Sequence, residues 1–295
     1  MAYHILLFIA ATFNRLPRTW TLALGRLLGA FLYLAFPHRK PVAWTNLSTA
    51  LPERSPRQRR AILWDTYQHF GQVLMDFIRI PAISAHHLKS IIDFDETHIQ
   101  EARDSGRGAI LVTGHIGSWE MTLLALGRRG YPLSGVAVTQ RGAGGRYVET
   151  VRQATGCRFI PKNTSARTML RLLGRGNFLG LVADQDARRS GVWVTYFGQP
   201  SSRARGGAVF TLHTGAPMLF GACLLQNDGR YRLNFVPIST HNLPDEREEA
   251  IRVLTQRYTD YLEEMVRRHP EQYFWFHRMW KTHPEKGEGL RQWNV

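Results

Sequence analysis

The residues best suited to chemistry are a histidine and a glutamate five positions apart in the segment His115-Ile116-Gly117-Ser118-Trp119-Glu120. The apolar run 109–113, bounded by Gly108 and Gly114, predicts a short buried strand, and the stretch that begins at Trp119 predicts a helix. His115 then lies at the strand's exit and Glu120 in the first helical turn, where the helix dipole favours an ionised carboxylate. Such a carboxylate can accept a hydrogen bond from one imidazole nitrogen, which leaves the other as a general base for a hydroxyl. Taken alone, the pattern also fits a polar strand end with a helix-capping glutamate.

Two further polar groups are candidates for the same site. Asp184 and Gln185 directly follow the predicted strand 178–183, at the carboxyl end where open α/β sheets place their sites, although an ordinary turn fits the same residues. Arg152 lies near the end of a predicted helix, where it could bind a phosphate, stabilise an oxyanion or simply be solvated.

Cations mark two other segments. Arg203 and Arg205 stand at the start of a predicted helix, and guanidinium groups beside free backbone amides predict a cradle for an anion or phosphate. The segment 273–281 mixes aromatic residues with cations. It fits the packing of an edge strand and equally a site that faces lipid headgroups.

Several common kinds of catalytic site are excluded by inspection. The chain has no G-x-S-x-G nucleophile elbow, no H-E-x-x-H zinc helix and no Walker A loop. Its two cysteines, Cys157 and Cys223, make neither a disulfide framework nor a zinc cluster, and His86-His87 is typical of a surface pair. Direct attack by a deprotonated substrate hydroxyl is therefore the simplest use of His115.

Alternating strands and helices after about residue 90 predict the fold that must position these groups. We expect an α/β fold with a mixed, largely parallel sheet flanked by helices and an antiparallel pair late in the chain. The expected strands are 109–113, 133–138, 157–160, 178–182, 193–197, 217–225 and 231–236. The expected helices are 118–128, 143–155, 165–174, 205–214 and 245–269.

The N-terminal part predicts a hydrophobic helical segment that contacts a membrane. Residues 1–37 are largely apolar but interrupted by arginines, so they favour a hairpin or tilted helix in one leaflet over a clean span. A pair of helices buried against the domain is the alternative. Residues 38–295 would form the α/β domain, with a helical lead-in over 38–105 that begins with a polar connection over 38–52 and continues as an amphipathic helix up to Arg79.

The charge of the chain predicts an anionic partner. Of 295 residues, 38 are Lys or Arg and 23 are Asp or Glu, which gives a net charge of +15. A non-enzymatic basic protein that binds nucleic acid or membranes would also carry this charge. That alternative shows no recognised binding motif and leaves the His115–Glu120 pair unused.

Several blocks of the sequence together resemble the lipid A biosynthesis acyltransferases, the lauroyl and myristoyl transferases of the lysophospholipid acyltransferase superfamily. The matching blocks are Asn46-Leu47 with Leu51-Pro52, Gly114 to Glu120 (with Ser118 where the family has Asn), Arg152, Asp184-Gln185, Gly206 to Pro217, and Trp275-x-His277-Arg278-x-Trp280-Lys281. Each block is weak alone, but their order and spacing are specific.

The resemblance implies transfer of a fatty acyl chain from an acyl carrier protein thioester to a hydroxyl of a lipid A precursor. It further implies His115 as general base, Glu120 as the group that orients it, and Arg152 and Arg205 as contacts for phosphate or developing charge. No metal or cofactor beyond the thioester co-substrate is expected. The expected partners are acyl carrier protein, a lipid or glycolipid acceptor and inner-membrane lipids, with no nucleic acid, and the expected location is the cytoplasmic side of the bacterial inner membrane. Related enzymes acylate other glycolipids or aminolipids, such as phosphatidylinositol mannosides, so the acceptor stays open.

Overall fold

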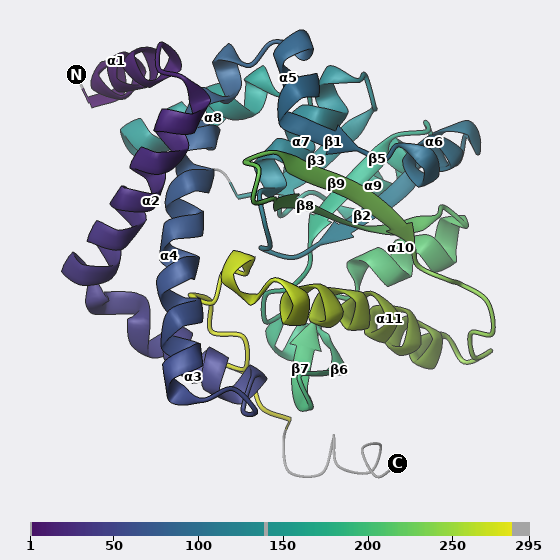
Figure 1. The fold of residues 1–295 in the computed structure, drawn as a ribbon. Coiled ribbons are helices and arrows are strands. Elements are labelled where there is room, and N and C mark those ends of the chain that lie inside the picture. Colours follow the sequence, from purple (N-terminus) through teal and green to yellow (C-terminus); the bar gives the residue numbers. More distant parts are fainter. Residues whose placement is uncertain (1, 139–140, 285–295) are drawn as a thin grey trace.

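The computed structural model describes residues 2–138 and 141–284. Its centre is a seven-stranded sheet (Figure 1). The strand order is β1-β9-β8-β2-β5-β3-β4, and every neighbouring pair is parallel except β8 and β9. The strands are β1 Ile92–Phe94, β2 Ala109–Thr113, β3 Leu133–Ala137, β4 Arg158–Pro161, β5 Phe178–Val182, β8 Met218–Leu225 and β9 Tyr231–Pro237. The predicted α/β class, the mostly parallel sheet and the late antiparallel pair are confirmed.

Two strands escaped the sequence prediction because they carry little apolar pattern. β1 has only three residues, and β7 (Gln199–Arg203) is polar and contains a proline. β7 pairs with β6 (Val192–Tyr196) as a separate antiparallel hairpin beside the sheet.

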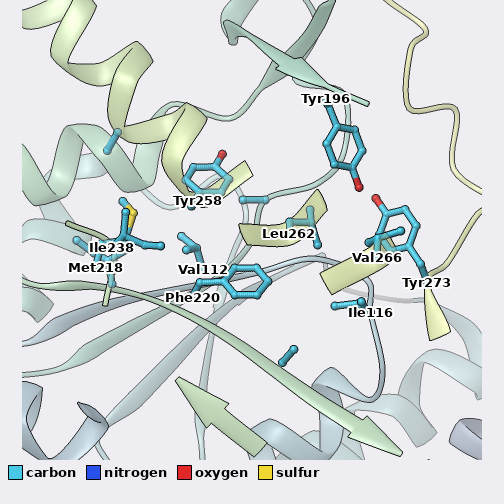
Figure 2. Close-up of a cluster of buried hydrophobic side chains, with 14 of the residues drawn as sticks. Val112, Ile116, Tyr196, Met218, Phe220, Ile238, Tyr258, Leu262, Val266 and Tyr273 are labelled. Atoms are coloured by element: carbon cyan, nitrogen blue, oxygen red, sulfur yellow. The ribbon is translucent and has the colours of Figure 1, made fainter. Parts of the chain in front are cut away.

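Helices cover both faces of the sheet, and the alternation of side chains along β2 divides the core between them. Val112 belongs to one cluster with residues of α10 (Gly206–Thr214) and α11 (Arg247–Arg268), and Figure 2 shows it with Phe220 opposite Tyr258 and Leu262 of α11. Leu111 belongs to the other cluster, which includes Leu124 of α7 (Trp119–Arg128). The helices of the domain are α5 Ala85–Ile91, α6 Thr97–Asp104, α7 Trp119–Arg128, α8 Gly142–Ala154, α9 Ala166–Leu173, α10 Gly206–Thr214 and α11 Arg247–Arg268.

In the described part of the chain, four helices precede α5 and the sheet: α1 Ala2–Asn14, α2 Arg18–Ala35, α3 Lys40–Ala50 and α4 Pro56–Arg79. The expectation of a polar connection over residues 38–52 is wrong, since most of it is helix α3. The apolar residues Ala43, Leu47 and Ala50 recur at helical spacing and are fully buried, and their packing outweighs the polar composition of the segment.

Helix α2 lies along α4 (Figure 1) and is attached closely to the rest of the molecule. A Cβ atom on Gly29 would lie 2.2 Å from the carbonyl oxygen of Tyr67, so the two helix backbones approach as closely as glycine allows. The guanidinium of Arg18 forms a bidentate ion pair with the fully buried carboxylate of Asp76, which also accepts a hydrogen bond from Tyr231 of β9 at 2.9 Å. The N-terminal helices are therefore docked on the domain through a buried charge network as well as through apolar contacts.

The outer sides of α1 and α2 remain apolar and exposed. Exposed large side chains include Phe8, Trp20, Leu27, Phe31 and Leu34. Among the described residues, no single helix has the length and hydropathy of a membrane span; only α2 and α3 taken together, with a bend of 100° between them, reach both.

Candidate active site

The centre of the site is a hydrogen-bonded pair of His115 and Asp184. Nδ1 of His115 lies 2.7 Å from Oδ1 of Asp184, and the backbone N–H of His115 donates to Oδ2 at 2.8 Å. Burial by itself lowers the pKa of His115, but the adjacent charge and hydrogen bond of Asp184 outweigh it and raise this pKa above its ordinary value. The same contacts with His115 overcome the burial of Asp184 and hold its pKa below the usual range. With Nδ1 occupied, Nε2 is the nitrogen left to act on a substrate.

The register of two adjacent strands brings this pair together. Thr113 of β2 is paired with Val182 of β5, and His115 and Asp184 each follow two residues later at the carboxyl edge of the sheet. Parallel pairing thus brings residues from distant parts of the sequence to equivalent positions. The predicted placement of Asp184 at the end of its strand is confirmed.

Arg203 supports Asp184 from within the protein and does not form an anion cradle. Its side chain is only 1% exposed, its guanidinium donates to the backbone carbonyl of Asp184, and it lies 4.1 Å from the centre of the Tyr196 ring. Figure 2 shows Tyr196 with its hydroxyl directed toward that of Tyr273, so this arginine lies among buried aromatic side chains. The expectation of a substrate contact at Arg203 is wrong because β7 places the side chain inside the core.

Glu120 is buried near the site but does not hold the imidazole. The hydrogen bond that we expected from His115 to Glu120 is made to Asp184 instead, because the strand register delivers that carboxylate directly to Nδ1. Among the described residues, no group hydrogen-bonds Oε2 of Glu120. Burial raises the pKa of Glu120 to about 7, although Trp119, Arg152 and His115 act in the opposite direction. Glu120 is therefore a carboxyl group poised between its two protonation states near neutral pH.

The C-terminal segment 272–277 closes over the exit of β2. The backbone N–H of Phe274 donates to the carbonyl of His115 at 2.8 Å, and the N–H of Gly117 donates to the carbonyl of Gln272 at 2.9 Å. The segment is not an edge strand, since it makes only an isolated bridge between Ile116 and Tyr273.

This segment adds His277, whose contact with the site the sequence did not predict. The ring centres of His277 and His115 are 4.6 Å apart, and Nε2 of His277 lies 3.1 Å from the amide nitrogen of Gln185. Burial, followed by the charge of His115, lowers the pKa of His277 to about 4, so this ring is neutral at physiological pH. The side chain of Asn46 donates to the backbone carbonyls of Trp275 (2.7 Å) and His277 (2.6 Å) and so holds the segment in place. Asn46 and His277 both belong to the sequence blocks on which the family resemblance rests. That resemblance is the one signal in the sequence that points to these two residues.

A cavity of about 580 Å³ opens beside His115. Most of its wall is apolar, with contributions from β2, β3, β5, α7 and α10. Gly135 of β3 and Gly180 of β5 are paired in register and both line it. A Cβ atom on Gly135 would lie 3.2 Å from the Phe159 ring, and one on Gly180 would lie 3.3 Å from Leu133, so glycine lets these lining side chains pack against the sheet. The polar lining residues include His115, Glu120, Arg152, Lys162 and Gln185. An apolar group can therefore lie in contact with an imidazole and several charged groups.

The two remaining arginine candidates differ in position. Arg152 lines the cavity, donates to the carbonyl of Val138 at 3.3 Å and stacks 5.2 Å from the centre of the Phe159 ring. Arg205 lies outside the cavity lining, and its Nη2 forms an ion pair with both carboxylate oxygens of Glu248 at 2.6 and 2.7 Å. Of the predicted cradle, Ala204 and the helix N-terminus at Gly206 and Gly207 line the cavity, whereas the lining includes neither Arg203 nor Arg205. Within residues 2–138 and 141–284, no three His, Cys, Asp or Glu side chains gather as a metal site requires, and the absence of a metal requirement stays a prediction.

Comparison with known proteins identifies the family of this chain. The model of the bacterial lipid A biosynthesis acyltransferases matches residues 1–282. The chain belongs to this family. It is 23% identical over 278 residues to the lipid A biosynthesis palmitoleoyltransferase of Escherichia coli, covering 92% of this chain and 88% of that one.

Two other proteins are similar over different extents. The phosphatidylinositol mannoside acyltransferase of Mycolicibacterium smegmatis is 29% identical over 167 residues, so the match spans about half of each chain (54% and 55%). The crystal structure of the 1-acyl-sn-glycerophosphate acyltransferase of Thermotoga maritima has a TM-score of 0.38 and 12% identity, covering 84% of this chain and 98% of that one. That structural similarity is too low to bear on the fold.

Proposed function

We propose that this protein is a membrane-associated O-acyltransferase that moves a fatty acyl chain from an acyl carrier protein thioester to a hydroxyl of a lipid A precursor. The observation that carries the proposal is the His115–Asp184 pair beside an apolar cavity of about 580 Å³. Family membership supports acyl transfer, and the cavity supports an aliphatic group as one part of the substrate.

The proposed reaction needs no covalent intermediate on the protein. Nε2 of His115 removes the proton of the acceptor hydroxyl as its oxygen attacks the thioester carbonyl carbon. The tetrahedral intermediate collapses with cleavage of the C–S bond, and the imidazolium returns its proton to the leaving thiolate. The ionised Asp184 stabilises the imidazolium between these steps. Arg152 is the cavity-lining arginine that would stabilise the oxyanion or a phosphate of the acceptor.

We also propose that α1 and α2 bind the cytoplasmic side of the bacterial inner membrane. Their exposed apolar face provides the insertion surface, and the net charge of +15 favours anionic headgroups. A membrane-bound acceptor would then be presented to a domain docked on the same helices through Arg18 and Asp76.

A second candidate acceptor is a phosphatidylinositol mannoside or another glycolipid or aminolipid. The observation that favours it is the 29% identity to a phosphatidylinositol mannoside acyltransferase. The chemistry at His115 would be the same, because each reaction needs only a deprotonated hydroxyl or amine and a thioester.

The test is acyl transfer by purified protein supplied with acyl carrier protein thioesters and a panel of candidate acceptor lipids. His115→Ala should lose roughly 10²–10⁴-fold in rate, as expected for a lost general base. His98→Ala is the matched control, since His98 also contacts a carboxylate (Glu101, 2.9 Å) but lies exposed on α6. Retention of more than about a third of wild-type activity in His115→Ala would contradict the mechanism.

A further inference from the structure

One stretch of the chain is strongly basic and contains no acidic residue. From Gln153 to Ala183 there are five cations, Arg158, Lys162, Arg167, Arg171 and Arg175, and neither Asp nor Glu. A region of one charge sign attracts a partner of the opposite sign. Residues 153–183 therefore favour an anionic partner.

Helix α9 presents this charge to solvent. Arg167 and Arg171 are four residues apart, so they lie on the same side of the helix, and both are exposed. The opposite side, with Met169, Leu172 and Leu173, is buried. In the part of the chain that the structure describes, neither arginine forms an ion pair, so both charges are available to a partner.

The basic helix begins at the wall of the cavity. Lys162, Thr164 and Ala166, in the segment that connects β4 to α9, all line the cavity beside His115. Lys162 is itself exposed. A partner held by Lys162, Arg167 and Arg171, the α9 basic patch, would thus lie next to an opening into the site.

The surroundings of α9 differ from those of the N-terminal apolar helices. α9 packs on β5 and α10, whereas α1 packs on α8 and α2 on α4. The large apolar side chains found exposed in the described structure include none between residues 158 and 176. A surface that inserts into a bilayer combines cations with exposed apolar groups, and α9 provides only the cations. The patch therefore suits an acidic protein better than a lipid surface.

We propose that the α9 basic patch is the docking surface for the acidic acyl carrier protein, whose thioester arm enters the cavity past residues 162–166. This inference rests on the proposed function, because it assumes a donor carried by a protein. The donor and the membrane-bound acceptor then approach on different elements, the donor over α9 and the acceptor over α1 and α2. Simultaneous binding of both substrates requires such a separation.

The test compares two donors in the Arg167→Glu/Arg171→Glu variant, with a detergent-solubilised acceptor. The KM for the acyl carrier protein thioester should rise at least about tenfold, since reversed charges at an interface slow encounter and oppose binding. kcat/KM with acyl-pantetheine, which lacks the carrier protein, should change less than about threefold because neither arginine lines the cavity. The wild-type KM for the protein donor should also rise with salt more steeply than that of the variant.

The matched control is Arg57→Glu/Arg60→Glu, the same change in charge on two exposed arginines in the first turns of α4. An equal rise in KM in this control, or an unchanged KM in the α9 variant, would overturn the docking surface while leaving acyl transfer intact. Loss of vesicle binding by the α9 variant with an unchanged KM for the protein donor would reassign the patch to the membrane. Failure of the wild-type protein to use either donor would instead refute the proposed function.

Discussion

Nδ1 of His115 and Oδ1 of Asp184 lie 2.7 Å apart although 69 residues separate them in the chain. The second carboxylate oxygen accepts the backbone N–H of the same histidine, so Asp184 fixes both the ring and the strand exit that carries it. Glu120, five residues from His115, is buried nearby without this bond. Proximity in space, set by strand register, therefore decides which carboxylate acts on the imidazole.

Asp184→Asn should lower kcat by roughly 10²–10⁴-fold, because the imidazolium loses the charge that stabilises it. The pH profile should move as well. Activity requires neutral His115, and in the wild-type protein Asp184 raises the pKa of His115 above 6.5, so the acid limb lies above that value. Without the carboxylate, burial dominates and the acid limb should shift to lower pH. An unchanged limb in kcat against pH would contradict the pairing, and Asp93→Asn, at the exposed position of β1, is the control.

Glu120→Gln should change the pH dependence of stability. The folded state raises the pKa of Glu120 from 4.5 to about 7, so it binds this proton more tightly than the unfolded chain does. Wild-type stability relative to the variant should therefore fall as pH rises from about 4.5 to about 7, by about 3 kcal/mol in total. Urea denaturation at about pH 4 and about pH 8 measures this difference. A pH-independent difference would show that the pKa of Glu120 is the same in the folded and the unfolded chain, and would contradict the shift.

Arg205→Ala should retain activity within about twofold, because the exposed ion pair of Arg205 contributes only about 0–1 kcal/mol to folding stability and Arg205 does not line the cavity. Its guanidinium is bonded to Glu248 and lies outside the cavity lining. Steady-state kinetics for donor and acceptor provide the measurement, with Arg152→Ala as the comparison that should lose activity. A selective rise in KM for the acceptor in Arg205→Ala would restore the phosphate contact that the sequence suggested.

Replacing Leu27, Phe31 and Leu34 by serine should weaken binding to anionic vesicles without unfolding the protein. These side chains are 66%, 59% and 72% exposed and lie on the outer side of α2. Removal of their apolar area from the insertion surface should lower the vesicle-bound fraction in co-sedimentation. The triple substitution to methionine keeps the apolar area and should bind normally. Equal binding by the serine variant would show that this face does not contact the bilayer.

Deletion of residues 1–37 would not isolate the contribution of these helices to membrane binding. The deletion would remove the partner of the buried carboxylate of Asp76 and expose the surface of α4 against which α2 packs. An uncompensated buried charge is strongly destabilising, so unfolding would obscure the effect on membrane binding. Arg18 and Gly29 contact Asp76 and Tyr67 of α4. These contacts dock the N-terminal helices on the domain, so the helices are not a detachable anchor.

The sequence by itself determined the elements and the positions at which chemistry occurs. Uninterrupted apolar runs specify buried parallel strands, so β2 and β5 were predictable, and with them the placement of His115 and Asp184 at strand ends. The short strand β1 and the polar strand β7 were not, because three residues are too few to show a period and β7 carries no hydrophobic pattern.

Only the tertiary structure decided which of these groups act together. Strand order placed β2 beside β5 and so gave His115 the carboxylate of Asp184 in place of Glu120. The pairing of β7 places Arg203 in the core. Asn46, 231 positions before His277 in the chain, holds the segment that places His277 against His115. Local sequence patterns encode secondary structure, whereas hydrogen bonds between distant segments depend on how the elements pack, and packing is a property of the whole chain.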